Sequence, residues 1–378
     1  MKEFHIQWHI LDRCNLRCSH CYQDDYSAKN ELSIEKLKLI ADNIDRTMKR
    51  WNSRVNILLT GGEPLLKEGI FELFSYLGEK KTVKETNIIT NGTLLSKNID
   101  KLENYKKCKY ILFSLDGVTE HTNDVIRGSG VFKKVLEQIK FIDNKRFKKI
   151  LMFTVSKKNY EDAYNLIEFG KKNNLDGIII EKLIPLGQSD NEFSNVLTKN
   201  MLKKLWDFLL IENGYDTNKS YEYRALKIEY KKRKNIESLI KNFFKKNKRR
   251  DDNLYYQKSE GKSENSICDK WENNEYEDQQ IIKSSIKVAN CIVGRDGCAI
   301  MPDGSVFPCR RLPISIGNLL EDEFYEIFEN SKKLKDLTDR NLLKGKCKDC
   351  DVNGCFGCRA MVYAVKKDLF SEDPHCWK

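Results

Sequence analysis

The stretch CNLRCSHCY, residues 14–22, places Cys14, Cys18 and Cys21 in a C-x3-C-x2-C spacing directly after the first predicted strand. Thiolates at such short spacings bind zinc or iron–sulfur clusters, and a closed site of either kind takes four protein ligands. Two interpretations follow from this stretch alone. His20 or a remote residue completes a structural zinc site, or three thiolates hold three irons of a [4Fe–4S] cluster and leave the fourth iron open to an outside ligand.

The composition is typical of a soluble globular protein, with 378 residues of which 40% are hydrophobic and 33% are charged. No apolar run approaches the length of a membrane span, and the opening MKEFHIQWHILDRC is neither a signal peptide nor an anchor. We therefore expect a cytoplasmic protein with no membrane contact. Thirteen cysteines, an odd number gathered mainly at the two ends of the chain, favour metal binding over a disulfide framework.

From the N-terminus to residue 187, short β-rich runs alternate with segments of helical periodicity. The predicted strands are 5–11, 55–60, 85–90, 110–115, 149–155 and 177–183, and the predicted helices are 33–50, 66–79, 97–107, 131–146 and 160–173. Six successive βα units imply a parallel sheet, either doubly wound or closed into a full or partial barrel.

Each unusual motif directly follows a predicted strand. After the cysteine triplet come GGEP (61–64), NGT (91–93), SLDG (114–117) and IPLG (184–187). In barrel enzymes the carboxyl ends of the strands form the active-site face. We therefore expect these motifs to meet at one mouth.

Beyond residue 190 the pattern changes. Residues 198–213 and 221–250 are predicted to be helical, 251–288 to be polar and flexible, and a cysteine-rich domain to run from 289 to the end. Residues 227–250 carry eleven Lys or Arg and two Glu, which accounts for most of the net charge of +11. This segment is either an amphipathic helix with a solvated lysine face or a docking surface for an acidic partner such as a leader peptide. No nucleic-acid-binding motif accompanies the charge.

CNLRCSHCY followed by GGEP after the next strand resembles the radical S-adenosylmethionine (SAM) enzymes. The resemblance covers residues 5–187 and implies a partial (β/α)6 barrel. In that family three cysteines hold a [4Fe–4S] cluster, here Cys14, Cys18 and Cys21, and SAM chelates its open iron. Cleavage of SAM then gives a 5′-deoxyadenosyl radical that abstracts a substrate hydrogen. The resemblance also implies SAM contacts from Tyr22, Gly61, Gly62, Glu63, Asn91, Ser114, Asp116, Arg127 and Leu183, with the Glu63 carboxylate on the SAM ammonium.

The C-terminal cysteines resemble the SPASM extension of this family, which carries two auxiliary [4Fe–4S] clusters and so implies three clusters in all. A zinc-ribbon-like module is the alternative. The G-x4-C element is present at 304–309, whereas the later element is shortened to C-x2-C-x4-C-x2-C. If Cys298 is not a ligand, the first auxiliary cluster has an open iron. By resemblance the first cluster takes Cys291, Cys298, Cys309 and Cys358, and the second takes Cys347, Cys350, Cys355 and Cys376.

These features predict three regions: a radical SAM core (1–187), a helical Lys-rich bridging region (188–288) and a SPASM domain (289–378). SPASM enzymes most often modify peptides, so we predict maturation of a ribosomally made peptide, for example by a thioether crosslink. A reductant such as flavodoxin or ferredoxin is expected. Because only thirteen residues precede Cys14, a leader would be bound by residues 188–288 or by a separate protein.

Several alternatives remain at this level. A sulfatase-maturing enzyme is disfavoured because Arg310 stands where that branch has Asp. A decarboxylase of the haem-synthesis type remains open. An iron–sulfur electron carrier or a zinc-binding interaction protein would not need GGEP and SLDG at strand ends. No catalytic side chain is predicted.

Overall fold

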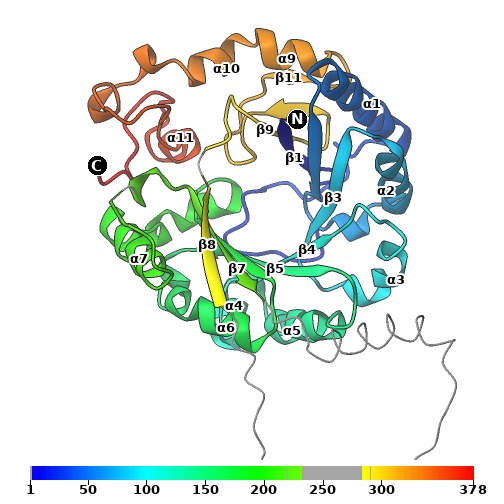
Figure 1. The fold of residues 1–378 in the computed structure, drawn as a ribbon, viewed down its shortest axis with the longest axis horizontal. Coiled ribbons are helices and arrows are strands. Elements are labelled where there is room, and N and C mark those ends of the chain that lie inside the picture. The colour runs from blue at the N-terminus through cyan, green and yellow to red at the C-terminus, as the bar shows by residue number, and fades with distance from the viewer. Residues whose placement is uncertain (1, 219, 232–282, 290) are drawn as a thin grey trace, which may run out of the picture. The chain divides into compact units, whose positions relative to one another are not determined.

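The computed structural model describes residues 2–218, 220–231, 283–289 and 291–378 (Figure 1). Six strands pair in parallel and in chain order, with the register His9↔Thr60 at the end of the first pair. This arrangement confirms the expected parallel βα architecture. The strands are β1 (Glu3–His9), β2 (Arg54–Thr60), β3 (Val83–Thr90), β4 (Tyr110–Ser114), β5 (Lys148–Val155) and β6 (Gly177–Lys182).

Helices lie outside the curved sheet, and the strands lie inside (Figure 1). Helix α1 shows why the sequence folds this way: the Ser33 hydroxyl accepts a hydrogen bond from Lys36 N at its start, and one face, including Leu37 and Ile44, is buried. The helices of this part are α1 (Ile34–Arg50), α2 (Ile70–Glu79), α3 (Ile99–Leu102), α4 (Glu120–Arg127), α5 (Val131–Phe141), α6 (Leu166–Lys172) and α7 (Lys199–Ile211). Short 3-10 helices are η1 (Pro64–Leu66), η2 (Leu95–Lys97), η3 (Lys157–Asn159), η4 (Asp162–Asn165), η5 (Gly187–Asn195) and η6 (Ser220–Glu222).

The C-terminal region begins by extending the barrel's own sheet. Strand β9 (Gly297–Ile300) pairs in parallel with β1, in the register Ile6↔Cys298, and β10 (Ser305–Phe307) and β11 (Gly317–Asn318) continue outward. At the other edge β7 (Ala225–Lys231) pairs antiparallel with β6, and β8 (Lys283–Ala289) follows. The tail also contains α9 (Phe324–Asn330), α10 (Lys332–Leu337), α11 (Arg359–Lys366), η8 (Arg340–Leu342) and η9 (Gly345–Cys347).

The predicted helix at 221–250 is wrong over residues 225–231, which form β7. Leu226, Ile228 and Tyr230 are buried at every second position, which is the period of a strand. The predicted flexible segment 251–288 is likewise a strand over residues 283–288. Residues 232–250 of the basic segment, residues 251–282 and Cys268 lie outside the described residues.

Residues 1–229 with 285–378 form one compact unit, and residues 230–284 form another. The three-region division at 187 and 288 stays a prediction. In the first unit, buried side chains such as Trp8, Phe113 and Phe153 fill the core. None of the helices in the described part of the chain is long and apolar enough to cross a membrane.

Candidate functional site

A cavity with about 980 Å³ of empty space, part of it open to solvent, is lined by residues at the carboxyl ends of the parallel strands. All three N-terminal cysteines line it, as the sequence predicted for one shared mouth. The predicted SAM contacts that line the same cavity are Tyr22, Gly61, Gly62, Asn91, Ser114, Arg127 and Leu183. Glu63 and Asp116 are absent from this lining, and both are fully buried.

Gly61 and Gly62 let the loop after β2 pack directly against the chain that leads into the cysteine triplet. A Cβ on Gly61 would lie 2.2 Å from the Leu11 carbonyl oxygen, and a Cβ on Gly62 would lie 2.1 Å from that of Arg13. Gly61 also has a φ of 132°, which side chains rarely adopt. In this close packing Gly62 N donates to Leu11 O at 3.0 Å and Glu63 N donates to Arg13 O at 2.9 Å. The glycines thus fix the two loops to each other.

Glu63 ties this loop to the end of β3. Its carboxylate accepts hydrogen bonds from Leu65 N (3.1 Å), Asn91 N (2.8 Å) and the Thr90 hydroxyl (2.8 and 3.0 Å). Burial raises the pKa of Glu63 to about 7, although these donors oppose the rise. The expected pairing of this carboxylate with the SAM ammonium stays a prediction, and its oxygens are held in place by these protein donors.

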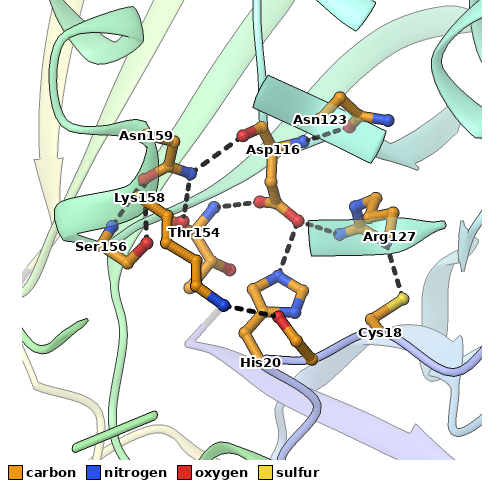
Figure 2. A network of polar contacts seen from close by, with 10 residues as sticks. Cys18, His20, Asp116, Asn123, Arg127, Thr154, Ser156, Lys158 and Asn159 are labelled. Atoms are coloured by element: carbon orange, nitrogen blue, oxygen red, sulfur yellow. Dashed lines mark hydrogen bonds and ion pairs between the residues drawn. The ribbon is translucent and has the colours of Figure 1, made fainter. Parts of the chain in front are cut away.

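Asp116 anchors a polar network beneath the cavity (Figure 2). Its Oδ2 lies 2.6 Å from Arg127 NH2 and 2.6 Å from His20 Nε2, and its Oδ1 accepts from Thr154 N at 2.7 Å. Burial opposes ionisation, but the charges of Arg127 and His20 outweigh it and lower the pKa of Asp116 to about 2. Asp116 therefore positions Arg127, which does line the cavity. His20 points its Nε2 at Asp116, and its buried Nδ1 has no partner among the described residues.

The cysteine triplet is surrounded by N–H groups aimed at sulfur. Leu16 N and Asn91 Nδ2 lie 3.4 and 3.7 Å from Cys14 Sγ, and an Arg127 nitrogen lies 3.9 Å from Cys18 Sγ. Hydrogen bonds of this kind stabilise the sulfurs of iron–sulfur clusters. Burial raises the pKa of Cys18 to about 11 although Arg127 opposes the rise, so its thiolate needs a metal to persist at neutral pH.

These donors and the shared cavity fit a cluster held by Cys14, Cys18 and Cys21. Within the described ranges no group of three or more His, Cys, Asp or Glu is arranged to hold a single metal ion.

In the tail, three of the four predicted ligands of the first auxiliary cluster interact electrostatically. The charges of Cys358 and Cys309 act on Cys291 and add to the burial that raises its pKa to about 11. Cys298 differs: it is buried within β9 and lines a second cavity, inside the barrel, and burial alone raises its pKa. Its role as a ligand stays a prediction, and the structure gives it a different environment from the other three.

The predicted second set is linked through Arg224 and Asp373. Arg224 NH2 donates to Cys355 Sγ at 3.3 Å, and Asp373 N donates to Cys347 Sγ at 3.5 Å. Asp373 is fully buried and lies 3.7 Å from Arg224. Cys376 N donates to the Asp373 carbonyl oxygen at 3.1 Å, and Arg340 donates to the backbone carbonyl of Cys350. The assignment of ligands to this cluster also stays a prediction.

Four residues of the cavity region carry charge that the sequence did not assign to the site. Arg310 and Arg311, directly after Cys309, line the cavity with Lys182, the last residue of β6. Glu181 forms an ion pair with Arg310 and lies 3.5 Å from Arg311. Arg310 was noted only as a departure from the sulfatase-maturing pattern. The one feature of the sequence that pointed to these residues was Lys182, near the end of a predicted strand.

Comparison with known proteins agrees with this site. The radical SAM superfamily matches residues 8–170, and the iron–sulfur cluster-binding domain called SPASM matches residues 291–351. The chain is a radical SAM enzyme with a SPASM domain. As such, it uses SAM and [4Fe–4S] clusters.

Among the relatives of this radical SAM enzyme is the AdoMet-dependent heme synthase of Methanosarcina barkeri, 28% identical over 98% of this chain and 95% of that protein. Solved structures with the same fold include Streptococcus suis SuiB bound to its precursor peptide SuiA (TM-score 0.59, 17% identity, 100% of this chain and 76% of that chain). Another is anSMEcpe with bound AdoMet and the Cp18Cys peptide (TM-score 0.65, 16% identity, 99% and 94%).

Proposed function

We propose that this enzyme binds SAM against a [4Fe–4S] cluster held by Cys14, Cys18 and Cys21, and that the 5′-deoxyadenosyl radical so formed abstracts a hydrogen from a substrate in the same cavity. The observation that carries the proposal is that the triplet and most of the predicted SAM contacts line one cavity. The cluster with SAM supplies the radical chemistry. The protein supplies the position of each group: Gly61 and Gly62 dock the loop after β2, and Asp116 orients Arg127.

We further propose that the tail cysteines hold two auxiliary clusters, which brings the total to three. The clustering of Cys291, Cys309 and Cys358, and the donors aimed at Cys347 and Cys355, support iron–sulfur binding at two places. An external one-electron reductant of the flavodoxin or ferredoxin class would supply the electron for SAM cleavage.

For the substrate, the first candidate is the propionate side chain of a tetrapyrrole, removed by oxidative decarboxylation as in haem synthesis. It is favoured by the match to the heme synthase, which spans nearly the whole of both chains and therefore includes the auxiliary-cluster domain. It is also favoured by the cationic side chains of the cavity, which suit a carboxylate. Hydrogen abstraction beside the carboxylate-bearing carbon, followed by loss of CO2 and of one electron to an oxidant, would leave a vinyl group.

The second candidate is a ribosomally made peptide that receives a crosslink such as a thioether, which the sequence interpretation favoured. Its support is that a neighbour of the same fold is known with its precursor peptide. Leader recognition would then fall to a separate protein or to the region between residues 188 and 288.

Anaerobic reconstitution with a strong reductant and SAM tests the shared chemistry. We expect about twelve irons per chain and release of 5′-deoxyadenosine. Absence of that product would overturn the proposed function. For the substrate, the same reaction is run with iron coproporphyrin III or with short cysteine-rich peptides encoded beside the gene. Mass spectrometry then reads loss of CO2 with hydrogen in the first case, and loss of hydrogens alone in the second.

A further inference from the structure

The residues that line the cavity carry more positive than negative charge. Four cationic side chains line it, namely Arg127, Lys182, Arg310 and Arg311, and no carboxylate is among its lining residues within the described part of the chain. Two carboxylates behind the wall, Asp116 and Glu181, pair with Arg127 and Arg310. Arg311 shares Glu181 with Arg310, and no ion pair within 4 Å joins Lys182 to a described carboxylate.

The guanidinium of Arg311 is held by two contacts, but one of its nitrogens has no hydrogen-bond acceptor in the described part of the chain. Its NH1 donates to the Lys182 carbonyl oxygen at 3.2 Å, and its NH2 lies 3.5 Å from Glu181 Oε1, which Arg310 already binds more closely. Its Nε is buried and has no acceptor among the described residues, and the sulfurs of Cys309 and Cys358 also interact with its charge. A guanidinium fixed in this way at the cavity wall needs no further ordering to bind an oxygen anion.

Lys182 lies beside Arg311 in space, although the two residues are far apart in sequence. Its side chain is only 4% exposed, yet it lines the cavity and makes no hydrogen bond or ion pair with any residue that the structure describes. Against the effect of burial, its charge is the largest that lowers the pKa of the Asp373 carboxyl, and Arg224, 3.7 Å from that carboxylate, acts next. Lys182 therefore feels a carboxylate at a distance but has no direct ion-pair partner among the described residues. An anion in the cavity would supply one.

We propose that Lys182 and Arg311 form an anion-binding subsite that holds a carboxylate of the substrate on the SPASM side of the cavity. The carboxylate oxygens would accept from the Arg311 guanidinium and from Lys182 Nζ, both of which line the cavity. This inference rests on the proposed function, because it places the substrate in the cavity that also holds SAM. It specifies the substrate as a carboxylate-bearing molecule.

The test measures binding of iron coproporphyrin III, whose side chains include propionates, to the reconstituted holoenzyme by absorbance titration. Its amide derivative, with every carboxylate converted to a carboxamide, is the neutral probe. We expect the acid to bind much more tightly than the amide. Lys182→Met and Arg311→Gln should each weaken binding of the acid by about ten- to a hundredfold, the range for one charge-assisted hydrogen bond. Lys148→Met, an exposed lysine at the far end of the neighbouring strand, is the matched control and should bind as the wild type does.

Thermal unfolding separates a ligand site from a folding defect. Lys182→Met should unfold at the same or a higher temperature than the wild type, because it removes a buried unpaired charge. Equal binding of acid and amide, wild-type affinity in both variants, or no binding of the acid by the wild type would each overturn the subsite. Formation of 5′-deoxyadenosine reports on the proposed function separately, since it is measured without the tetrapyrrole.

Discussion

Gly62→Ala adds one methyl group at the point where the loop after β2 meets the chain before the cysteine triplet. The new Cβ would lie 2.1 Å from the Arg13 carbonyl oxygen, 2.5 Å from its carbon and 2.5 Å from the Asp12 carbonyl oxygen. All three are backbone atoms of one segment. No flexible side chain can move aside, so the two loops must separate by roughly 1 Å to restore an ordinary contact.

Forcing a methyl group into a packed site costs typically about 1–3 kcal/mol. The separation also weakens the hydrogen bonds that Gly62 N and Glu63 N donate across this contact, at 3.0 and 2.9 Å. Each bond adds about 1 kcal/mol, so we expect a loss of about 3–5 kcal/mol of unfolding free energy in all. For a chain of this size the melting temperature should fall by several degrees. Because the same contact places the triplet against the SAM pocket, 5′-deoxyadenosine formation should fall at least about tenfold, as an ångström of displacement does in other enzymes.

Gly78→Ala is the matched control. Gly78 lies within α2, and a Cβ there would meet nothing within 4 Å. It should raise the unfolding free energy by about 0.5–1 kcal/mol and leave SAM cleavage unchanged. Calorimetry of the reconstituted enzymes gives the first quantity, and chromatography of 5′-deoxyadenosine gives the second. If Gly62→Ala had the same melting temperature as Gly78→Ala and cleaved SAM at the wild-type rate, the contact between the two loops would not position the cysteine triplet.

Three other perturbations test separate parts of the site. Asp116→Asn removes the charged partner of Arg127. Breaking a buried ion pair costs about 3–5 kcal/mol, so the urea midpoint should fall by more than about 1 M. The control Asp162→Asn affects only the hydrogen bond from Val118 N and should shift the urea midpoint far less. Cys18→Ala should abolish 5′-deoxyadenosine and remove about four irons while the tail clusters keep their absorbance. Burial, and after it the charge of Arg310, lowers the pKa of His9 to about 3, so the folded protein favours the neutral imidazole. The stabilising effect of this neutral form is present above about pH 6.5 and is lost as the pH falls toward 3. His9→Gln should therefore flatten the dependence of the urea midpoint on pH, and an unchanged dependence would contradict the role of His9.

The alternation of strands and helices could be predicted from the sequence, because the hydrophobic periodicity changes between the strand and the helix of each βα unit. The helical period of residues 33–50 predicted α1, and apolar runs such as 149–155 predicted their strands. Motifs at strand ends gave the cavity, because parallel strands bring their carboxyl ends to one edge. Both inferences use local patterns, so neither needed the tertiary contacts.

The directions in which the Glu63 and Asp116 side chains point could not be predicted from the local sequence pattern. Both are polar, both follow strands, and both belong to motifs that meet SAM by resemblance. Only the fold shows that Glu63 accepts from Thr90 and Asn91, and that Asp116 faces Arg127 and His20. The strand at 225–231 was missed for a related reason, since the charged residues Lys227 and Glu229 stand between Leu226, Ile228 and Tyr230 within a longer basic segment.

The cationic subsite depends on a contact between residues far apart in sequence. Glu181 and Lys182 end the last parallel strand of the barrel, whereas Arg310 and Arg311 follow Cys309 of the tail. Strand β9 joins the first barrel strand, so the tail begins as an extension of the sheet. The arginine pair then reaches across to the sixth strand and closes the cavity there. The SPASM region therefore contributes part of the cavity wall, and a substrate carboxylate bound to Arg311 would lie next to Cys309, an expected ligand of an auxiliary cluster. This proximity would give an electron leaving such a substrate a short path to an auxiliary cluster.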